Sequence, residues 1–233
     1  MTDGYQFAYL TGNLILFIIW LTLFIYRKDL RHKMLLMSCL IAPLGPLSEI
    51  FFTRDYWKPE LFNGWQIGIE DLLFGFFAGG IASVFYEEIL GKKYTKRHLA
   101  GHPRWMLGFV IFSFSSLILM NIIFGFNSIY ISVAGFLIIG AVIIAIRHDL
   151  ARVAFLSGFF AGIMALILYI IFLYLFPGVI ERWWLLSNIS GILILGIPFE
   201  ELLWAFGWGM VVGPAYEFTT GYFYRRQNYY LRR

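Results

Sequence analysis

Seven long apolar blocks dominate this sequence and restrict it to few folds. Each holds about 20 residues or more, and a helix of that length crosses the roughly 30 Å of membrane hydrocarbon. The chain of 233 residues is 60% hydrophobic and 14% charged, which is more apolar than one soluble core can hide. The blocks cover residues 8–26, 34–53, 66–90, 105–123, 128–146, 153–176 and 194–220. We therefore predict an all-α, polytopic, multi-pass protein of the cytoplasmic membrane with seven transmembrane helices.

The basic residues predict how these helices are oriented. The first ten residues, MTDGYQFAYL, lack a basic stretch and a small-residue cleavage site, so we expect the first block to stay as a permanent span. Segments that follow the first, third, fifth and seventh blocks hold 15 of the 18 Lys and Arg residues. The positive-inside rule then places the N-terminus outside and the C-terminus in the cytoplasm. This asymmetry explains the net charge of +4 without a nucleic-acid partner, and the basic loops are suited to contact lipid headgroups.

An internal repeat organises the blocks. Residues 68–87 (GIEDLLFGFFAGGIASVFYE) align without a gap with residues 198–217 (PFEELLWAFGWGMVVGPAYE), and RKDL at 27–30 is echoed by RHDL at 147–150. We predict two three-helix copies joined by the fourth block as a linker helix, which makes the two copies parallel in the membrane. The predicted divisions are 1–91 for the first repeat, 92–126 for a basic cytoplasmic loop and the linker helix, and 127–233 for the second repeat with its basic cytoplasmic tail.

Two acidic pairs occupy matching positions in the repeat, Glu70 with Asp71 and Glu200 with Glu201. A carboxylate at membrane depth costs a few kcal/mol, so it marks a functional site by default. Burial and a like-charged neighbour both favour the protonated form of a carboxyl group. A protonated acid can donate a proton and an ionised partner can remove one. We predict that these four acids are catalytic.

Aromatic residues share a helix face with the acidic pairs, since residues four apart are neighbours on a helix. Phe74 follows Glu70 by one turn, and Trp204 follows Glu200 in the same way. Aromatic faces beside a proton donor suit a carbocation, through cation–π attraction. The histidines form no clustered ligand set, so we predict no metal site. The predicted substrate-binding residues are Glu49, Phe74, Trp204, Trp208 and Pro198.

These features resemble the integral-membrane, flavin-free lycopene cyclases, which are built from two lycopene cyclase domains of about three helices each. That family carries a Pro-x-Glu-(Glu/Asp) motif implicated in catalysis. The second copy here, Pro198-Phe199-Glu200-Glu201, matches the motif fully, whereas the first copy has Gly68 in place of the proline. The resemblance covers nearly the whole chain through the tandem pattern. Because the first copy departs from the motif at Gly68, a cyclase that acts on another isoprenoid is an alternative.

The resemblance implies a redox-neutral ring closure that uses no cofactor. A carboxylic acid protonates the terminal double bond of a linear polyene such as lycopene, an internal alkene attacks the tertiary cation, and a carboxylate removes a proton to give a β-ionone ring. The apolar carotenoid or isoprenoid substrate would enter from the lipid bilayer.

Other membrane proteins fit the sequence less well. A prenyltransferase needs aspartate-rich motifs such as D-x-x-x-D to hold magnesium and diphosphate, and a retinal protein needs a lysine in its last span. Neither feature is present, and no G-x-G-x-x-G follows a strand to indicate a flavin or NAD site. A small proton-coupled transporter remains the alternative, because intramembrane acids and repeated halves occur in that class too. A polar path open to both sides would favour the transporter.

Overall fold

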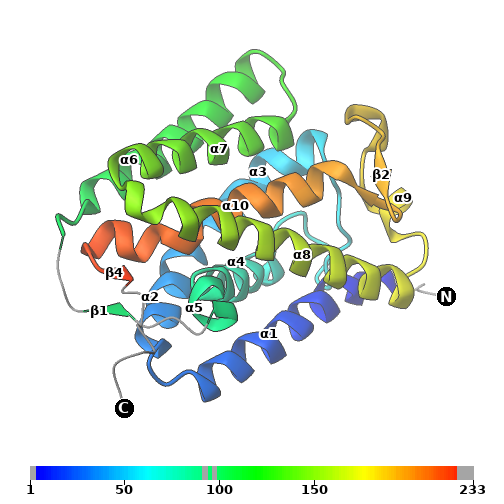
Figure 1. Cartoon of the computed structure of the whole chain (residues 1–233). Helices are drawn as coiled ribbons and strands as arrows, with labels where there is room; N and C mark the ends of the chain where they lie inside the picture. The colour runs from blue at the N-terminus through cyan, green and yellow to red at the C-terminus, as the bar shows by residue number, and fades with distance from the viewer. Residues whose placement is uncertain (1–3, 91–93, 96–98, 225–233) are drawn as a thin grey trace.

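The computed structural model describes residues 4–90, 94–95 and 99–224, and in this part the chain is mostly helical (Figure 1). The α-helices are α1 (Ala8–Tyr26), α2 (Arg31–Ile41), α3 (Leu44–Asp55), α4 (Ile69–Ala82), α5 (Phe85–Leu90), α6 (Pro103–Ser116), α7 (Ser128–Ile146), α8 (Ala151–Leu175), α9 (Val179–Trp183) and α10 (Phe199–Thr220). Shorter helices are η1 (Tyr5–Phe7), the π-helix η2 (Leu117–Ile123), η3 (His148–Leu150) and η4 (Leu186–Asn188). Strands β1 (Tyr94–Thr95) and β4 (Phe223–Tyr224) pair antiparallel, as do β2 (Leu193–Ile194) and β3 (Ile197–Pro198).

The helices pack in two groups that follow the order of the chain. In the first, α4 packs against α1, α2 and α3, and in the second, α10 packs against α7 and α8. Helix α10 runs through the middle of the molecule, and α6 with α7 forms a hairpin at one side (Figure 1). Close approach of α8 and α10 depends on glycine, because a Cβ atom at Gly209 would lie 2.5 Å from the Ser157 carbonyl oxygen. The backbones of α8 and α10 therefore come close together at a residue that has no side chain.

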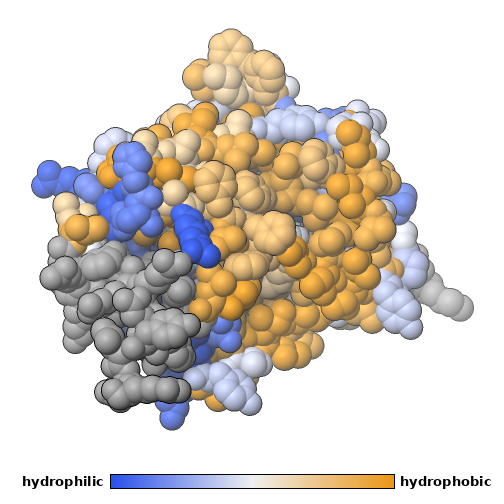
Figure 2. All heavy atoms as spheres, viewed as in Figure 1, coloured by the Kyte–Doolittle hydropathy of each residue, from blue (hydrophilic) through white to orange (hydrophobic). Residues whose placement is uncertain are grey.

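Five helical segments are long and apolar enough to cross a membrane in the described part of the chain. They are Tyr5–Tyr26, Ile69–Leu90, Pro103–Ile123, Ser128–Ile146 and His148–Leu175. Many large hydrophobic side chains on α1, α6, α7 and α8 are exposed, which suits contact with lipid tails. Figure 2 shows apolar residues over most of one face, with hydrophilic residues gathered toward the left end. The protein is thus a helical membrane protein, as the apolar blocks predict.

The seven-span arrangement is not confirmed in detail. The predicted span 34–53 is two helices, α2 and α3, bent by 44°, and the break falls at Ala42 and Pro43, where proline disfavours a continuous helix. Counting that pair as one span gives up to six candidates. Helix α10 has 22 residues but is not among them, because its composition is less apolar. The last predicted span, 194–220, begins only at Phe199, after the β2–β3 hairpin.

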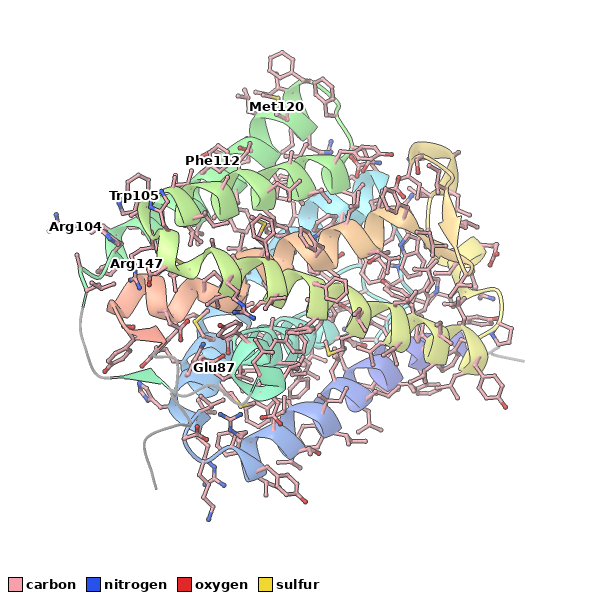
Figure 3. The ribbon with its side chains drawn as sticks, viewed as in Figure 1. Glu87, Arg104, Trp105, Phe112, Met120 and Arg147 are labelled. Atoms are coloured by element: carbon pink, nitrogen blue, oxygen red, sulfur yellow. The ribbon has the colours of Figure 1, made fainter. Side chains whose placement is uncertain are left out.

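The sidedness of the termini and the repeat stay predictions. Many of the basic residues that support the orientation lie outside the described residues, namely Lys92, Lys93, Lys96, Arg97, Arg225, Arg226, Arg232 and Arg233. In the side-chain view, Arg104, Arg147 and Glu87 lie toward the end of the bundle where β1 and β4 pair, whereas Trp105, Phe112 and Met120 lie along the outer α6–η2 segment (Figure 3).

One contact occurs in both predicted copies. Arg27 donates through Nε to Asp29 over 3.0 Å, and Arg147 donates through Nε to Asp149 over 2.7 Å. Each arginine also donates through Nη1 to a backbone carbonyl, over 3.3 Å and 3.2 Å. These carbonyls belong to Glu87 and Glu217, which occupy matching positions in the sequence alignment. The RKDL and RHDL echoes thus fold into the same local arrangement.

A buried ion cluster joins the two groups of helices at this end. Lys33 Nζ on α2 lies 2.6 Å from Glu87 Oε1 on α5 and 2.8 Å from Glu217 Oε1 on α10. All three side chains are almost completely buried. A buried charge is tolerated when it is paired and hydrogen-bonded. The cluster therefore ties the first half of the chain to the second.

Candidate functional site

A cavity of about 200 Å³ lies inside the bundle, with walls from α1, α3, α4, α8 and α10. Most of its lining is aromatic or aliphatic. The polar groups on the wall are Tyr9, Asn13, Glu49, Tyr56, Tyr169 and Glu201. A mainly apolar pocket with a few convergent polar groups is the usual form of a small-molecule site.

Glu201 is held in the first turn of α10 by donors from distant parts of the chain. Its Oε1 accepts a hydrogen bond of 2.6 Å from the Tyr56 hydroxyl and one of 2.8 Å from Trp184 Nε1. Tyr169 lines the same cavity. Hydrogen bonds to a carboxylate favour its ionised form. These donors therefore fix the position of the Glu201 carboxyl group at the cavity wall.

Tyr56 follows the last residue of α3 and lies outside that helical segment. Burial raises the pKa of the Tyr56 phenol well above its usual value, and the neighbouring Glu201 carboxylate raises it further. A phenol with a raised pKa keeps its proton, so Tyr56 remains a hydrogen-bond donor to Glu201 over a wide pH range.

Glu49 brings a second carboxyl group to the cavity from α3. Its Oε2 accepts a hydrogen bond of 2.8 Å from Trp57 Nε1. The side chain is 7% exposed, and the charges that act on it come from Asp71 and Glu201. Glu49 is thus a buried acid with acidic neighbours, at the same cavity as Glu201.

The first acid of each predicted pair accepts a hydrogen bond from the backbone of the loop before its helix. Glu70 Oε1 accepts a hydrogen bond of 3.0 Å from the backbone amide of Phe62. Glu200 Oε1 accepts bonds of 2.9 Å from the amide of Ser190 and from the Tyr130 hydroxyl. Both carboxyl groups are buried, and neither residue lines the cavity. These contacts fasten the segment that precedes each helix.

The second acid differs between the two copies because of the residue at the helix N-cap. The Gly68 amide donates a bond of 2.8 Å to Asp71 Oδ2, which is the bond that an acidic third residue makes in a capping box. Pro198 occupies the corresponding position before α10 and has no amide proton. Glu201 cannot make this bond, and it faces the cavity instead. Asp71 is buried behind the wall.

Aromatic rings surround the carboxyl groups. Trp204 and Trp208 stack with their ring centroids 5.4 Å apart, and Phe74 lies 6.3 Å from Trp204. Tyr9 and Trp57 meet edge to face at 5.3 Å. All five residues line the cavity. Such π faces attract a cation that forms between them.

The structure brings together five of the nine predicted site residues at the cavity wall, namely Glu49, Phe74, Glu201, Trp204 and Trp208. Pro198 lies at the start of α10 and acts on the site through its missing amide. The residues that sequence reasoning missed are the donors Tyr56, Trp57 and Trp184 and the lining residue Tyr169. A pair of aromatic residues ahead of each acidic pair, at 56–57 and 183–184, is a signal that could have indicated three of them.

One comparison with known proteins gives a match, and it lies in the second half of the chain. Residues 127–219 match the protein-family model described as lycopene cyclase. Searches of curated proteins and of solved structures gave no significant match. Residues 127–219 are therefore similar to lycopene cyclases, and the matched segment contains Glu201 and both tryptophans of the cavity wall on α10.

Proposed function

We propose that this protein is a membrane-embedded carotenoid cyclase that closes a ring at the end of a linear polyene. The reaction consumes no oxidant or reductant. A proton adds to the terminal double bond, the resulting tertiary cation is attacked by an internal alkene, and loss of a proton from the ring leaves the β-ionone product. One proton enters and one leaves, so substrate and product are isomers.

The observation that carries this proposal is the position of Glu201. A carboxylate that accepts hydrogen bonds from Tyr56 and Trp184 faces an apolar, aromatic cavity inside a helical membrane protein. An anion fixed in such a site stabilises positive charge as it develops, without reorganising water. Among the four acids that the sequence marks as catalytic, Glu201 is the one at the cavity wall, while Glu70 and Glu200 bind loop backbone.

The cavity is large enough to hold only part of a long polyene. At about 200 Å³ it is smaller than the roughly 300–1,000 Å³ of typical pockets for drug-sized ligands. We infer that it takes one end of the polyene while the remainder lies against lipid. An apolar substrate of this kind reaches the protein by diffusion within the cytoplasmic membrane.

The same cavity also allows two alternative functions to be compared with the proposed one. A cyclase for another isoprenoid fits the cavity equally well, and the departure from the family motif at Gly68 supports this alternative. A proton-coupled transporter fits less well, because the tryptophan and phenylalanine side chains that dominate the wall offer few partners to a polar solute.

Expression of the chain in a lycopene-accumulating bacterium tests the proposal. We expect the extracted pigments to contain a monocyclic or bicyclic carotene, resolved from lycopene by chromatography and absorption spectrum. The same host with an empty vector provides the control. Unchanged lycopene at good expression would exclude lycopene as the substrate, and linear precursors of other lengths would then be compared.

A further inference from the structure

Two carboxyl groups line the cavity, those of Glu49 and Glu201, and the buried carboxyl group of Asp71 lies behind the wall. Glu49 comes from α3, Asp71 from α4 and Glu201 from α10. Glu49 interacts electrostatically with both of the others. Within residues 4–90, 94–95 and 99–224, no lysine or arginine forms an ion pair with any of them. Three negative charges without a cation are unfavourable in apolar surroundings, so at least one group keeps a proton.

The three carboxyl groups differ in the hydrogen bonds that they accept. Glu201 accepts bonds from Tyr56 and Trp184, which favour its ionised form. Asp71 accepts the amide of Gly68 at the helix N-terminus, where negative charge is stabilised. Glu49 receives only the indole N–H of Trp57 among the described donors. With a single donor, Glu49 is the group of the three that is best suited to keep a proton.

Two tryptophans in contact place this acid beside Glu201. Trp57 donates to Glu49 and Trp184 donates to Glu201. The two indole rings lie 5.3 Å apart, and the backbones of the same residues form an isolated β-bridge. One pair of neighbouring tryptophans thus holds two carboxyl groups, Glu49 and Glu201, at the same cavity.

We propose that Glu49 is the general acid of the cyclisation and that Glu201 is its carboxylate partner. This inference rests on the proposed cyclase function. The O–H bond of Glu49 breaks as its proton forms a C–H bond at the terminal double bond of the polyene. The electrons of the internal alkene close the ring, and Glu201 removes the ring proton as the new double bond forms. The cycle is complete when Glu201 releases its proton and Glu49 regains one from solvent.

Isosteric variants measured in deuterated water test the two roles. In the active wild type, the ring product should carry one deuterium at the protonated carbon. Glu49→Gln should lower turnover about 100-fold or more, the range for loss of a general acid, while still binding polyene. Because glutamine can accept the Trp57 N–H, the variant should express and unfold like the wild type. Glu49→Asp should recover part of the activity.

The variant Glu201→Gln distinguishes the residue that donates the proton from the residue that removes it. Glu201→Gln retains the acid, so reversible protonation should leave deuterium in the recovered linear polyene even though little ring product forms. Linear polyene recovered from Glu49→Gln should carry no label. A Glu49→Gln protein that cyclises at the wild-type rate would overturn the assignment while leaving the cyclase function intact. A wild type that forms no cyclic product would overturn the function, and this assignment with it.

Discussion

The backbone amide of Gly68 lies 2.8 Å from Asp71 Oδ2 and donates a hydrogen bond to it. No such bond is possible between Pro198 and Glu201, because proline has no amide proton. A single residue at the helix N-cap thus distinguishes two acids that are equivalent in sequence. In the first copy the acid caps the N-terminus of the helix, and in the second copy it faces the cavity.

This difference predicts that Asp71 contributes to stability through the cap. Asp71→Ala should lower the free energy of unfolding by about 1 kcal/mol, the typical cost of losing a helix N-terminal cap interaction. Asp71→Asn keeps an oxygen that can accept the Gly68 amide and should lose less. Thermal unfolding of the purified proteins in detergent measures both. Equal losses in the two variants would show that charge, rather than the cap, is what matters.

The two adjacent acids of α10 should respond differently to the same substitution. Glu201→Gln removes the carboxylate at the cavity wall and should reduce cyclic product about 100-fold or more. Glu200→Gln leaves an oxygen that can accept the Ser190 amide and the Tyr130 hydroxyl, so most activity should remain. Pigment analysis in the lycopene-accumulating host compares them at matched expression. The opposite ranking would place the chemistry at Glu200.

Tyr56→Phe should weaken catalysis by removing one donor from Glu201. A hydrogen bond to a charged group contributes about 1.5–3 kcal/mol, which corresponds to a loss of roughly 10- to 150-fold. The raised pKa of the Tyr56 phenol means that it stays neutral as pH rises past the usual phenol value, about 10. The wild type should therefore show no loss of this donor at mildly alkaline pH.

Tyr130→Phe is the matched control, since Tyr130 donates to Glu200 over 2.9 Å and lies outside the cavity wall. Initial rates of both variants in membranes, from pH 6 to 9, provide the comparison. Similar losses in both would contradict a specific role for the Tyr56–Glu201 bond.

Lys33 should be a strong determinant of stability. Lys33→Met leaves Glu87 and Glu217 buried without their shared cation, and removing one partner of a buried ion pair costs about 3–5 kcal/mol. Adding Glu87→Gln to this variant should recover part of the loss, because one buried charge is then removed. Lys28→Met changes an exposed lysine near the same end and should have little effect. Unfolding curves in detergent would be compared for the wild type, Lys33→Met, the double variant with Glu87→Gln, and Lys28→Met. A Lys33→Met protein as stable as the wild type would contradict this prediction.

Glycine at position 209 should be required by the contact between α8 and α10. In Gly209→Ala the new Cβ would lie 2.5 Å from the Ser157 carbonyl oxygen and 2.6 Å from Ala161 Cβ. Overpacking of this kind costs about 1–3 kcal/mol. Gly108→Ala in α6 meets no atom within 4 Å and should be neutral or slightly stabilising, since alanine favours a helix. A tolerated Gly209→Ala would mean that the two helices can move apart at little cost.

The sequence by itself determined the class of the protein. Apolar blocks of membrane-spanning length predict a helical membrane protein, and the motif Pro198–Glu201 points to the family that residues 127–219 match. Both signals are local, because hydrophobicity and motif spacing are read from neighbouring residues. The same local signals place Phe74, Trp204 and Trp208 near acids, and all three line the cavity.

The tertiary structure decided how the acids are used. That Glu201 faces the cavity while Glu70 and Glu200 bind loops depends on partners such as Tyr56, which lies 145 residues away in the chain. The contact of Lys33 with Glu217 is equally non-local, because the two residues lie 184 positions apart in the chain. The direction of a side chain at a helix terminus depends on which donors the fold brings to it, and the sequence around an acidic pair does not show which of its two acids those donors reach.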